Sequence, residues 1–202
     1  GIFYWFKITG KAPKNAMVVE VTGKQFGWEF RYPGRDGVLG KKYFKNVNPA
    51  IGNPAGQIWD DPANNDDIFV EQEMHLVVGR PVQLVIGAKD VIHDVGLAHF
   101  RLKMDAVPGT PTTMWFTPTI TTADMRKKTS NPDFVYEISC DQMCGKGHWS
   151  MRGVIVVESQ EEYDAWLAGK KPQYLVANPD KDPSVKKDTL SATAPVTGAV
   201  IR

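Results

Sequence analysis

Twelve consecutive residues, Cys140 to Met151, contain two cysteines, one histidine and one methionine in the spacing C-x3-C-x3-H-x2-M. A stretch rich in strand-forming residues precedes this segment at 134–139, and another follows it at 153–157. A loop between adjacent strands can bring its side chains to one point, and Gly145 and Gly147 permit the tight backbone path that this requires. The sequence therefore predicts a ligand loop held between two strands.

The ligand types in this loop favour copper. Thiolate, thioether and imidazole groups together select copper, and one Cys with His and an axial Met is typical of mononuclear blue-copper sites. Here Cys140 and Cys144 could each bridge two metal ions, which predicts a pair of coppers with one terminal imidazole each. His148 supplies one imidazole. Of the remaining histidines, His93 is the best candidate for the other, because it follows the predicted strand 81–86, and Asp94 or a backbone carbonyl could orient its ring.

Other uses of these residues were weighed. A disulfide between cysteines four residues apart in a short loop rarely has good geometry. Zinc sites take further Cys or His ligands rather than Met. A nucleophilic Cys144 paired with His148 would need a group to orient the base and an oxyanion hole, and the sequence indicates neither. Met151 alone would more often fill a core. His75 and His99 are interpreted as ordinary surface or partner-facing histidines.

The rest of the chain predicts an all-β fold. Short segments rich in Val, Ile and aromatic residues are separated by turn residues, which indicates an antiparallel sandwich or barrel. These predicted strand segments are 17–32, 68–78, 81–86, 112–118, 133–139 and 153–158. In the first of them, Phe26, Trp28, Phe30 and Tyr32 alternate and are expected on one face. Ser159 and Glu162 form a capping box, which predicts a short helix ending near Gly169.

Length and charge limit the domain organisation and the partners. The chain has 202 residues and a formal net charge of +1, so no global charge favours nucleic acid. The aromatic run at residues 1–6 fits a hydrophobic first strand, a trimmed signal remnant or the end of a transmembrane helix. Because aromatic residues followed by Lys7 are typical of the interfacial end of such a helix, we expect residues 1–15 to be that end and a linker. Residues 16–170 are the predicted copper domain and 171–202 an irregular extension. The acidic residues between Asp60 and Asp67 could steer a basic partner.

At this point the sequence resembles a known family, subunit II of the haem-copper cytochrome oxidases. The segment 140–151 resembles the loop of that family's dinuclear copper centre, called CuA. His93 resembles the family's upstream ligand, and the later stretch Asp105-Ala106-Val107-Pro108-Gly109 resembles its D-A-[VI]-P-G signature. Residues 23–28 resemble the family's aromatic strand. The resemblance covers about residues 16 to 168. It implies a cupredoxin-like Greek-key β-barrel or sandwich, with a short C-terminal helix and an irregular tail.

The resemblance also implies a ligand set, which comprises His93 and His148 as terminal imidazoles, Cys140 and Cys144 as bridging thiolates, Met151 as a weak thioether and Gln142 through its backbone carbonyl. The family commonly has Glu at position 142, and its carboxylate helps to bind magnesium at the boundary with subunit I. Gln142 therefore makes magnesium doubtful in this chain. The family often has a Trp, through which the electron enters, where this chain has Phe26. Either Trp28 takes over that role or the entry point has moved with the donor.

The function implied by the resemblance is one-electron transfer within a terminal respiratory oxidase. The copper centre would accept electrons from a c-type cytochrome or similar periplasmic donor and pass them to haem in subunit I, where O2 is reduced and protons are pumped. The chain would then be an enzyme subunit that performs no oxygen chemistry itself. Expected partners are subunit I, other oxidase subunits and the membrane through N-terminal helices. The expected location is the periplasmic side of a bacterial inner membrane, or the intermembrane space of a mitochondrion.

Several alternatives remain. The CuA domain of nitrous oxide reductase shares the ligand spacing, but the D-A-V-P-G stretch argues against it. A mononuclear blue-copper carrier would not need the second cysteine. A quinol oxidase subunit II lacks the cysteine ligands that are present here. A copper-storage or assembly module would use similar ligands without needing a tuned loop.

Overall fold

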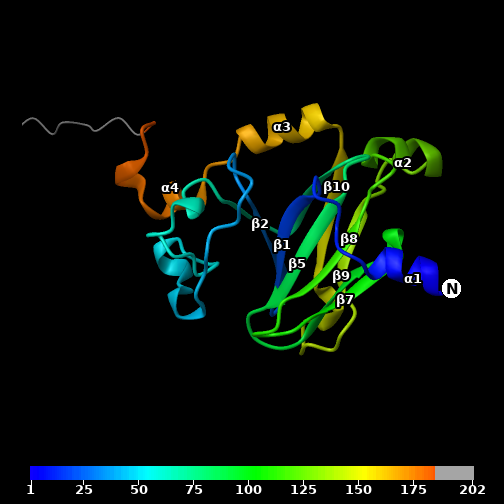
Figure 1. The fold of residues 1–202 in the computed structure, drawn as a ribbon, viewed down its shortest axis with the longest axis horizontal. Coiled ribbons are helices and arrows are strands. Elements are labelled where there is room, and N and C mark those ends of the chain that lie inside the picture. Colours follow the sequence, from blue (N-terminus) through cyan, green and yellow to red (C-terminus); the bar gives the residue numbers. More distant parts are fainter. Residues whose placement is uncertain (185–202) are drawn as a thin grey trace, which may run out of the picture.

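Two five-stranded β-sheets form the body of the protein in the computed structural model, which describes residues 1–184 (Figure 1). The first sheet has the strand order β3 (Ile68–Glu71), β2 (Gly27–Tyr32), β1 (Met17–Lys24), β5 (Val82–Ala88) and β8 (Thr112–Phe116). The second has the order β4 (Glu73–Val77), β10 (Arg152–Glu158), β9 (Tyr136–Cys140), β6 (His93–Leu97) and β7 (Leu102–Ala106). The predicted all-β class is confirmed.

The core lies between the sheets and follows from the alternation of apolar residues along the strands. In the first sheet, Val19, Val21 and Leu84 are fully buried, and in the second, Ile138 and Ile155 are fully buried. Successive strand residues point to opposite faces, so these positions line one face of each sheet. β1 pairs with β5 and β10 with β4 in parallel, and the other pairings are antiparallel.

Every predicted strand segment contains a strand, but two of them contain two. The segment 17–32 turns at Gln25 and Phe26, so Phe26 lies in the turn rather than on the aromatic face with Trp28. The segment 68–78 is divided at Gln72, which has a φ of 64°. Because β3 and β4 belong to different sheets, this residue carries the chain from one sheet to the other.

Two strands and two helices were not predicted, and the second of these helices, α4 (Gln173–Ala177), is described below. β6 is buried along its whole length, so it lacks the polar–apolar alternation by which a strand is recognised. β7 follows β6 after a single turn, η4 (Ala98–Phe100). The helix α2 (Thr122–Thr129) has almost no apolar face, and it begins after an N-cap at Thr121.

The predicted C-terminal helix is confirmed as α3 (Gln160–Ala168). Ser159 and Glu162 form both hydrogen bonds of the capping box, and Gly169 is the C-cap. Its Tyr163 and Trp166 rings lie 6.4 Å and 5.2 Å from the buried Tyr32 ring. At the other end of the chain, the aromatic run forms α1 (Ile2–Thr9), none of whose residues is buried. Among residues 1–184, no helix has the length and apolar character needed to cross a bilayer.

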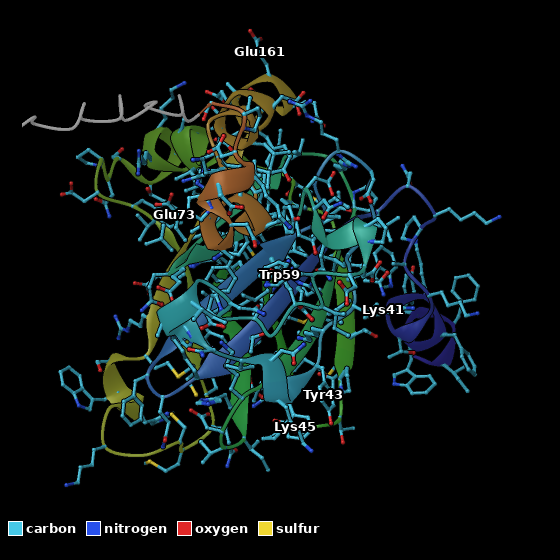
Figure 2. All side chains as sticks on the ribbon, turned by 90° about the vertical axis from the view of Figure 1, so that its left-hand side faces the viewer. Lys41, Tyr43, Lys45, Trp59, Glu73 and Glu161 are labelled. Atoms are coloured by element: carbon cyan, nitrogen blue, oxygen red, sulfur yellow. The ribbon has the colours of Figure 1, made fainter. Side chains whose placement is uncertain are left out.

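A side lobe, which we define as residues 34–67, covers the outer face of the first sheet (Figures 1 and 2). It contains the turns η1 (Phe44–Asn46), η2 (Pro49–Ile51) and η3 (Pro62–Asn64). A buried ion pair joins the lobe to the first sheet, because Arg31 on β2 lies 2.9 Å from Asp67 of the lobe. Arg31 also lies 2.7 Å from Glu20 on β1. Figure 2 labels Lys41, Tyr43, Lys45 and Trp59 on this lobe.

The acidic residues of the side lobe have structural roles. Asp67 is fully buried against Arg31, Asp61 accepts hydrogen bonds from Lys41 N and Ala63 N, and Asp66 accepts one from Asp36 N. Asp61 and Asp66 therefore hold turns and Asp67 holds an ion pair, while Asp60 is exposed. That this cluster steers a basic partner stays a prediction.

Part of the predicted irregular extension packs on the side lobe. The segment forms α4 (Gln173–Ala177) and η6 (Pro179–Lys181). Gln173 donates from its backbone N to Asp67 O at 2.9 Å and from Nε2 to Gly52 O at 2.7 Å. Residues 185–202 of the predicted extension lie outside the described residues.

Candidate metal centre

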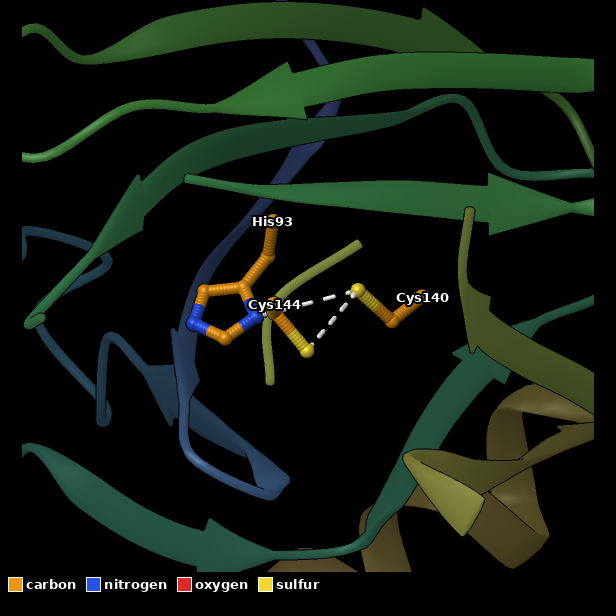
Figure 3. A group of neighbouring side chains, drawn as sticks. All are labelled: His93, Cys140 and Cys144. Atoms are coloured by element: carbon orange, nitrogen blue, oxygen red, sulfur yellow. Dashed lines mark hydrogen bonds between the residues drawn. The ribbon is translucent and has the colours of Figure 1, made fainter. Parts of the chain in front are cut away.

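Two adjacent strands of the second sheet deliver the first ligands. Cys140 is the last residue of β9 and His93 is the first residue of β6, and these strands pair with Val95 opposite Cys140. The loop from 141 to 151 then leaves β9, passes through the turn η5 (His148–Ser150) and enters β10. His93 therefore begins a strand that was not predicted from the sequence. Figure 3 shows its ring facing the two cysteine sulfurs.

The predicted ligands lie together. Cys140 Sγ is 3.7 Å from Cys144 Sγ and 3.7 Å from His93 Nδ1. Cys144 Sγ is 3.7 Å from His148 Nδ1 and 3.8 Å from Met151 Sδ. Among the Asp, Glu, Cys and His side chains of residues 1–184, one group of three has ligand atoms that all lie within 4.8 Å of one another. This group is His93, Cys140 and Cys144.

These separations suit metal ligation. A sulfur–sulfur distance of 3.7 Å is far longer than the disulfide bond of about 2.05 Å, and both cysteines are free thiols. Ligand atoms that share a metal at about 2.0–2.3 Å each are separated by somewhat less than 4 Å. The backbone carbonyl of Gln142 also points to the cluster, since Cys140 Sγ donates to it at 3.1 Å. The donor set therefore fits a soft metal such as copper.

Asp90 orients the ring of His93. Its Oδ1 lies 2.8 Å from His93 Nε2, while His93 Nδ1 faces Cys140. The sequence suggested Asp94 or a backbone carbonyl for this role, and both suggestions are wrong. The partner is the Asp90 side chain, and Asp94 is the next residue along β6 and points to the opposite face of the sheet. Burial alone would raise the pKa of Asp90, but the hydrogen bonds from His93 and from two backbone amides lower it below its usual value.

Glycines and a glutamine shape the walls of the site. A Cβ atom at Gly23 would lie 2.8 Å from His93 Cδ2, so only glycine leaves room for the ring there. Gln25 donates from Nε2 to Cys144 O at 2.5 Å and thereby ties the ligand loop to the β1–β2 turn. Sequence reasoning missed Gln25 and Asp90. The loop and turn residues around them gave no signal, because their contacts depend on how distant strands pair.

The Cys144 thiol lies in a protein environment that favours its neutral form. Burial and the neighbouring Cys140 thiol raise the pKa of Cys144 to about 11. A thiol must lose its proton to bind a metal, so metal uptake at this site releases protons.

The two residues expected at the point where the electron enters occupy different environments. Trp28 is fully buried, and its ring centroid lies 6.2 Å from that of His93. Phe26 is 39% exposed, and its ring packs on Gly147 of the ligand loop, where a Cβ would lie 2.5 Å from the ring. Phe26 thus reaches the surface beside the loop, whereas Trp28 lies behind His93.

The other histidines lie outside this cluster. His75 was expected at the surface, but it is buried, with Nδ1 at 2.7 Å from Glu158 and Nε2 at 2.8 Å from Glu73, and its ring stacks on Trp166. His99 lies in η4 against the rings of Phe134 and Tyr136.

Comparison with known proteins gives consistent matches. The family model for the periplasmic domain of cytochrome c oxidase subunit II matches residues 17–160. The alternative cytochrome c oxidase subunit 2 of Bradyrhizobium diazoefficiens is 37% identical over 85% of this chain and 57% of its own length. Cytochrome c oxidase subunit 2 of Thermostichus vulcanus is 31% identical over 79% of this chain and 34% of its own length. The chain thus spans between about a third and little more than half of these relatives.

Solved structures show the same fold. The crystal structure of the periplasmic domain of subunit II of the cytochrome oxidase of Bradyrhizobium japonicum matches with a TM-score of 0.55 and 21% identity, over 81% of this chain and 99% of that one. A second structure contains a cytochrome c oxidase subunit II in a mixed disulfide with a thioredoxin-like protein. It matches with a TM-score of 0.51 and 22% identity, over 79% and 94% of the two chains.

Proposed function

The chain belongs to the family of cytochrome c oxidase subunit II, and on that premise we propose that it is the electron-transfer part of a terminal respiratory oxidase. A dinuclear copper centre, when bound, supplies reversible one-electron redox chemistry between a c-type cytochrome or similar donor and the haem of subunit I. Reduction of O2 and proton pumping belong to the partner subunit.

The observation that carries this proposal is the paired arrangement of the donor atoms. Cys140 has the imidazole of His93 and the carbonyl of Gln142 beside it. Cys144, whose sulfur lies 3.7 Å from that of Cys140, has its own imidazole and the thioether of Met151. Two thiolates, each with its own set of neighbouring ligands, suit two metal ions that share both sulfurs. A single copper would leave one imidazole and one thiolate without a use.

The residues of this chain keep the ligand geometry fixed. Asp90 fixes the ring of His93, and Gln25 fixes the loop at Cys144. His93 and Met151 are buried and Cys140 and Cys144 nearly so, which keeps water away from most of the ligand atoms. A rigid and mostly dry ligand set changes little between oxidation states, and a small structural change favours rapid electron transfer.

The docking and assembly roles extend the proposal. We assign the donor-facing surface to the neighbourhood of Phe26, because its exposed ring touches the ligand loop, with the buried Trp28 behind His93 as a further aromatic contact. The exposed aromatic face of α1 suits attachment to a membrane, with the metal domain on the periplasmic side. Gln142 has no side-chain carboxylate, so its side chain does not suit magnesium at the family's position.

A relative suggests how the thiols are prepared for copper. In the solved mixed disulfide, a thioredoxin-like protein is bonded to a subunit II. The two sulfurs here are close enough for a small movement to join them, and only free thiols can bind copper. We therefore expect a thiol reductase of that kind to act on this chain before copper is inserted.

The test is electron paramagnetic resonance on the copper-loaded, air-oxidised chain, with metal content measured by mass spectrometry on the same sample. We expect two coppers per chain and hyperfine structure from one electron shared between two copper nuclei. Cys144→Ser should abolish the shared signal, and His99→Asn, which alters a histidine outside the cluster, should preserve it. A signal from one copper nucleus in the unaltered chain, or stoichiometric zinc, would contradict the dinuclear centre and favour a mononuclear carrier or a structural metal site.

A further inference from the structure

Four large apolar side chains on three separate loops are exposed around the metal centre. On the ligand loop, Trp149 is 81% exposed and Met143 is 73% exposed. Ile92, directly before His93, is 47% exposed, and Phe26 in the β1–β2 turn is 39% exposed. Each of the four is next to a ligand in the sequence or packs on the ligand loop, and we call them the apolar rim. Large apolar residues that are exposed together at one place are typical of an interaction site.

Trp149 has the largest exposed fraction of the exposed large apolar residues within 1–184. Its backbone is nevertheless fixed, because it is the middle residue of the turn η5. Ser150 N donates to Gly147 O at 3.0 Å, and Met151 N donates to His148 O at 3.2 Å. The indole ring is therefore held in water by a hydrogen-bonded turn. Apolar surface exposed to water costs free energy, and burial against a partner removes that cost.

One peptide bond joins Trp149 to a residue of the metal centre. That residue is His148, whose Nδ1 lies 3.7 Å from Cys144 Sγ. Electron tunnelling is faster through covalent bonds than across gaps between atoms. An electron that arrives at the indole ring therefore has a short and continuous route of bonds to a ligand atom.

The two aromatic residues already considered for electron entry are less suited to touch a partner. Trp28 is fully buried, with its ring behind that of His93. Phe26 reaches the surface, but more than half of it is covered and its ring packs on Gly147. Gly147 is the N-cap of the turn that carries Trp149, so the rings of Phe26 and Trp149 flank the same turn. The apolar rim is thus continuous with the donor-facing surface that we assigned to the neighbourhood of Phe26.

We propose that Trp149 is the residue through which the electron enters the metal centre, and that the apolar rim is the surface on which the electron donor docks. This inference rests on the proposed function and names the contact residue for it. The donor is a protein whose haem edge is exposed among apolar side chains, because an apolar rim with a protruding aromatic ring is complementary to such a surface. In the step, ferrous haem loses one electron and becomes ferric, and that electron reduces the oxidised copper pair. No bond forms or breaks, and no proton is transferred.

The test is electron transfer from a reduced, water-soluble c-type cytochrome to the copper-loaded full chain, followed by the haem absorbance after rapid mixing. We expect Trp149→Leu to lower the second-order rate constant about tenfold or more, as loss of a central aromatic contact does. Trp149→Phe keeps an aromatic ring and should lower it less. The matched control is Phe44→Leu, which alters a ring that is 73% exposed on the side lobe and should leave the rate constant unchanged.

Three further measurements separate electron entry at Trp149 from damage to the metal centre. The electron paramagnetic resonance spectrum and the copper content of Trp149→Leu should equal those of the unaltered chain, because the ring is exposed and is not a ligand. Reduction by a small ruthenium(II) ammine complex, which needs no protein docking surface, should be equally fast in both chains. Binding of the oxidised cytochrome to the copper-free chain, followed by the nuclear magnetic resonance signals of the cytochrome, should weaken in Trp149→Leu and not in Phe44→Leu.

The outcomes distinguish this inference from the proposed function. If the unaltered chain holds two coppers but accepts no electron from the cytochrome, both are overturned. If the unaltered chain is reduced and Trp149→Leu shows the same rate constant and the same affinity for the cytochrome, the proposed function stands and Trp149 is not the entry residue. Another subunit of the oxidase is then the partner that covers the apolar rim. Equal slowing with the ruthenium complex would assign the effect to the copper centre itself and would also overturn the inference.

Discussion

Removal of the Asp90 carboxylate tests whether the ring of His93 is positioned for a metal. Oδ1 accepts from His93 Nε2 at 2.8 Å and from Val91 N, and Oδ2 accepts from Gln25 N at 2.7 Å. In Asp90→Ala all three bonds are lost, so the imidazole is free to turn and Nδ1 no longer faces the cysteine sulfur. In Asp90→Asn one oxygen remains, and the amide nitrogen must face a donor, so part of the support is lost.

The expected magnitude follows from the position of Asp90 behind a ligand. Loss of a group that orients a metal-bound histidine lowers metal affinity about 10- to 100-fold, which is about 1.4–2.7 kcal/mol. We expect Asp90→Ala to lie within this range and Asp90→Asn to lie closer to the unaltered chain. The free energy of unfolding without metal should change much less, because Asp90 is on the surface side of the ring and a third of its side chain is exposed.

The assay is a copper titration in competition with a chelator of known affinity, with urea unfolding of the metal-free variants as a parallel measurement. Asp133→Asn is the control for removing one negative charge. If the copper affinity of Asp90→Ala stays within about twofold of that of the unaltered chain, His93 Nδ1 is not a ligand atom that Asp90 orients.

Two further predictions concern packing and pH. Gly23→Ala places a methyl group about 2.8 Å from the ring of His93 and should reduce copper affinity about tenfold or more. The control is Gly87→Ala on the neighbouring strand, where the added methyl group meets open space and copper affinity should not change. Equal copper affinities in titrations of the two variants would contradict this packing argument. Burial raises the pKa of Asp67 to about 6 from 3.8, so the fold favours its protonated form. This contribution to stability is complete below about pH 4 and is lost as the pH rises through about 6, so the unaltered chain should lose stability relative to Asp67→Asn over that interval. Urea unfolding between pH 4 and pH 7 measures the difference, and parallel curves for the two chains would show that Asp67 does not titrate in this interval.

The sequence alone was sufficient for the parts of the protein that are local along the chain. Cys140, Cys144, His148 and Met151 fall within one loop, so their spacing predicts that they can meet, and the structure brings them together. The helix after Ser159 was predictable for the same reason, because a capping box uses residues three positions apart. Alternating apolar residues likewise identified most strands, since burial of one sheet face leaves a period of two.

Tertiary structure decided everything that depends on which strands pair. The ring of His93 meets a cysteine 47 residues away only because β6 and β9 are neighbours with a particular register. The same pairing assigns Asp90 rather than Asp94 to the ring. A strand places successive side chains on opposite faces, so a register shifted by one residue would exchange these roles. Register depends on the packing of the whole sandwich, and no short segment of the sequence contains that information.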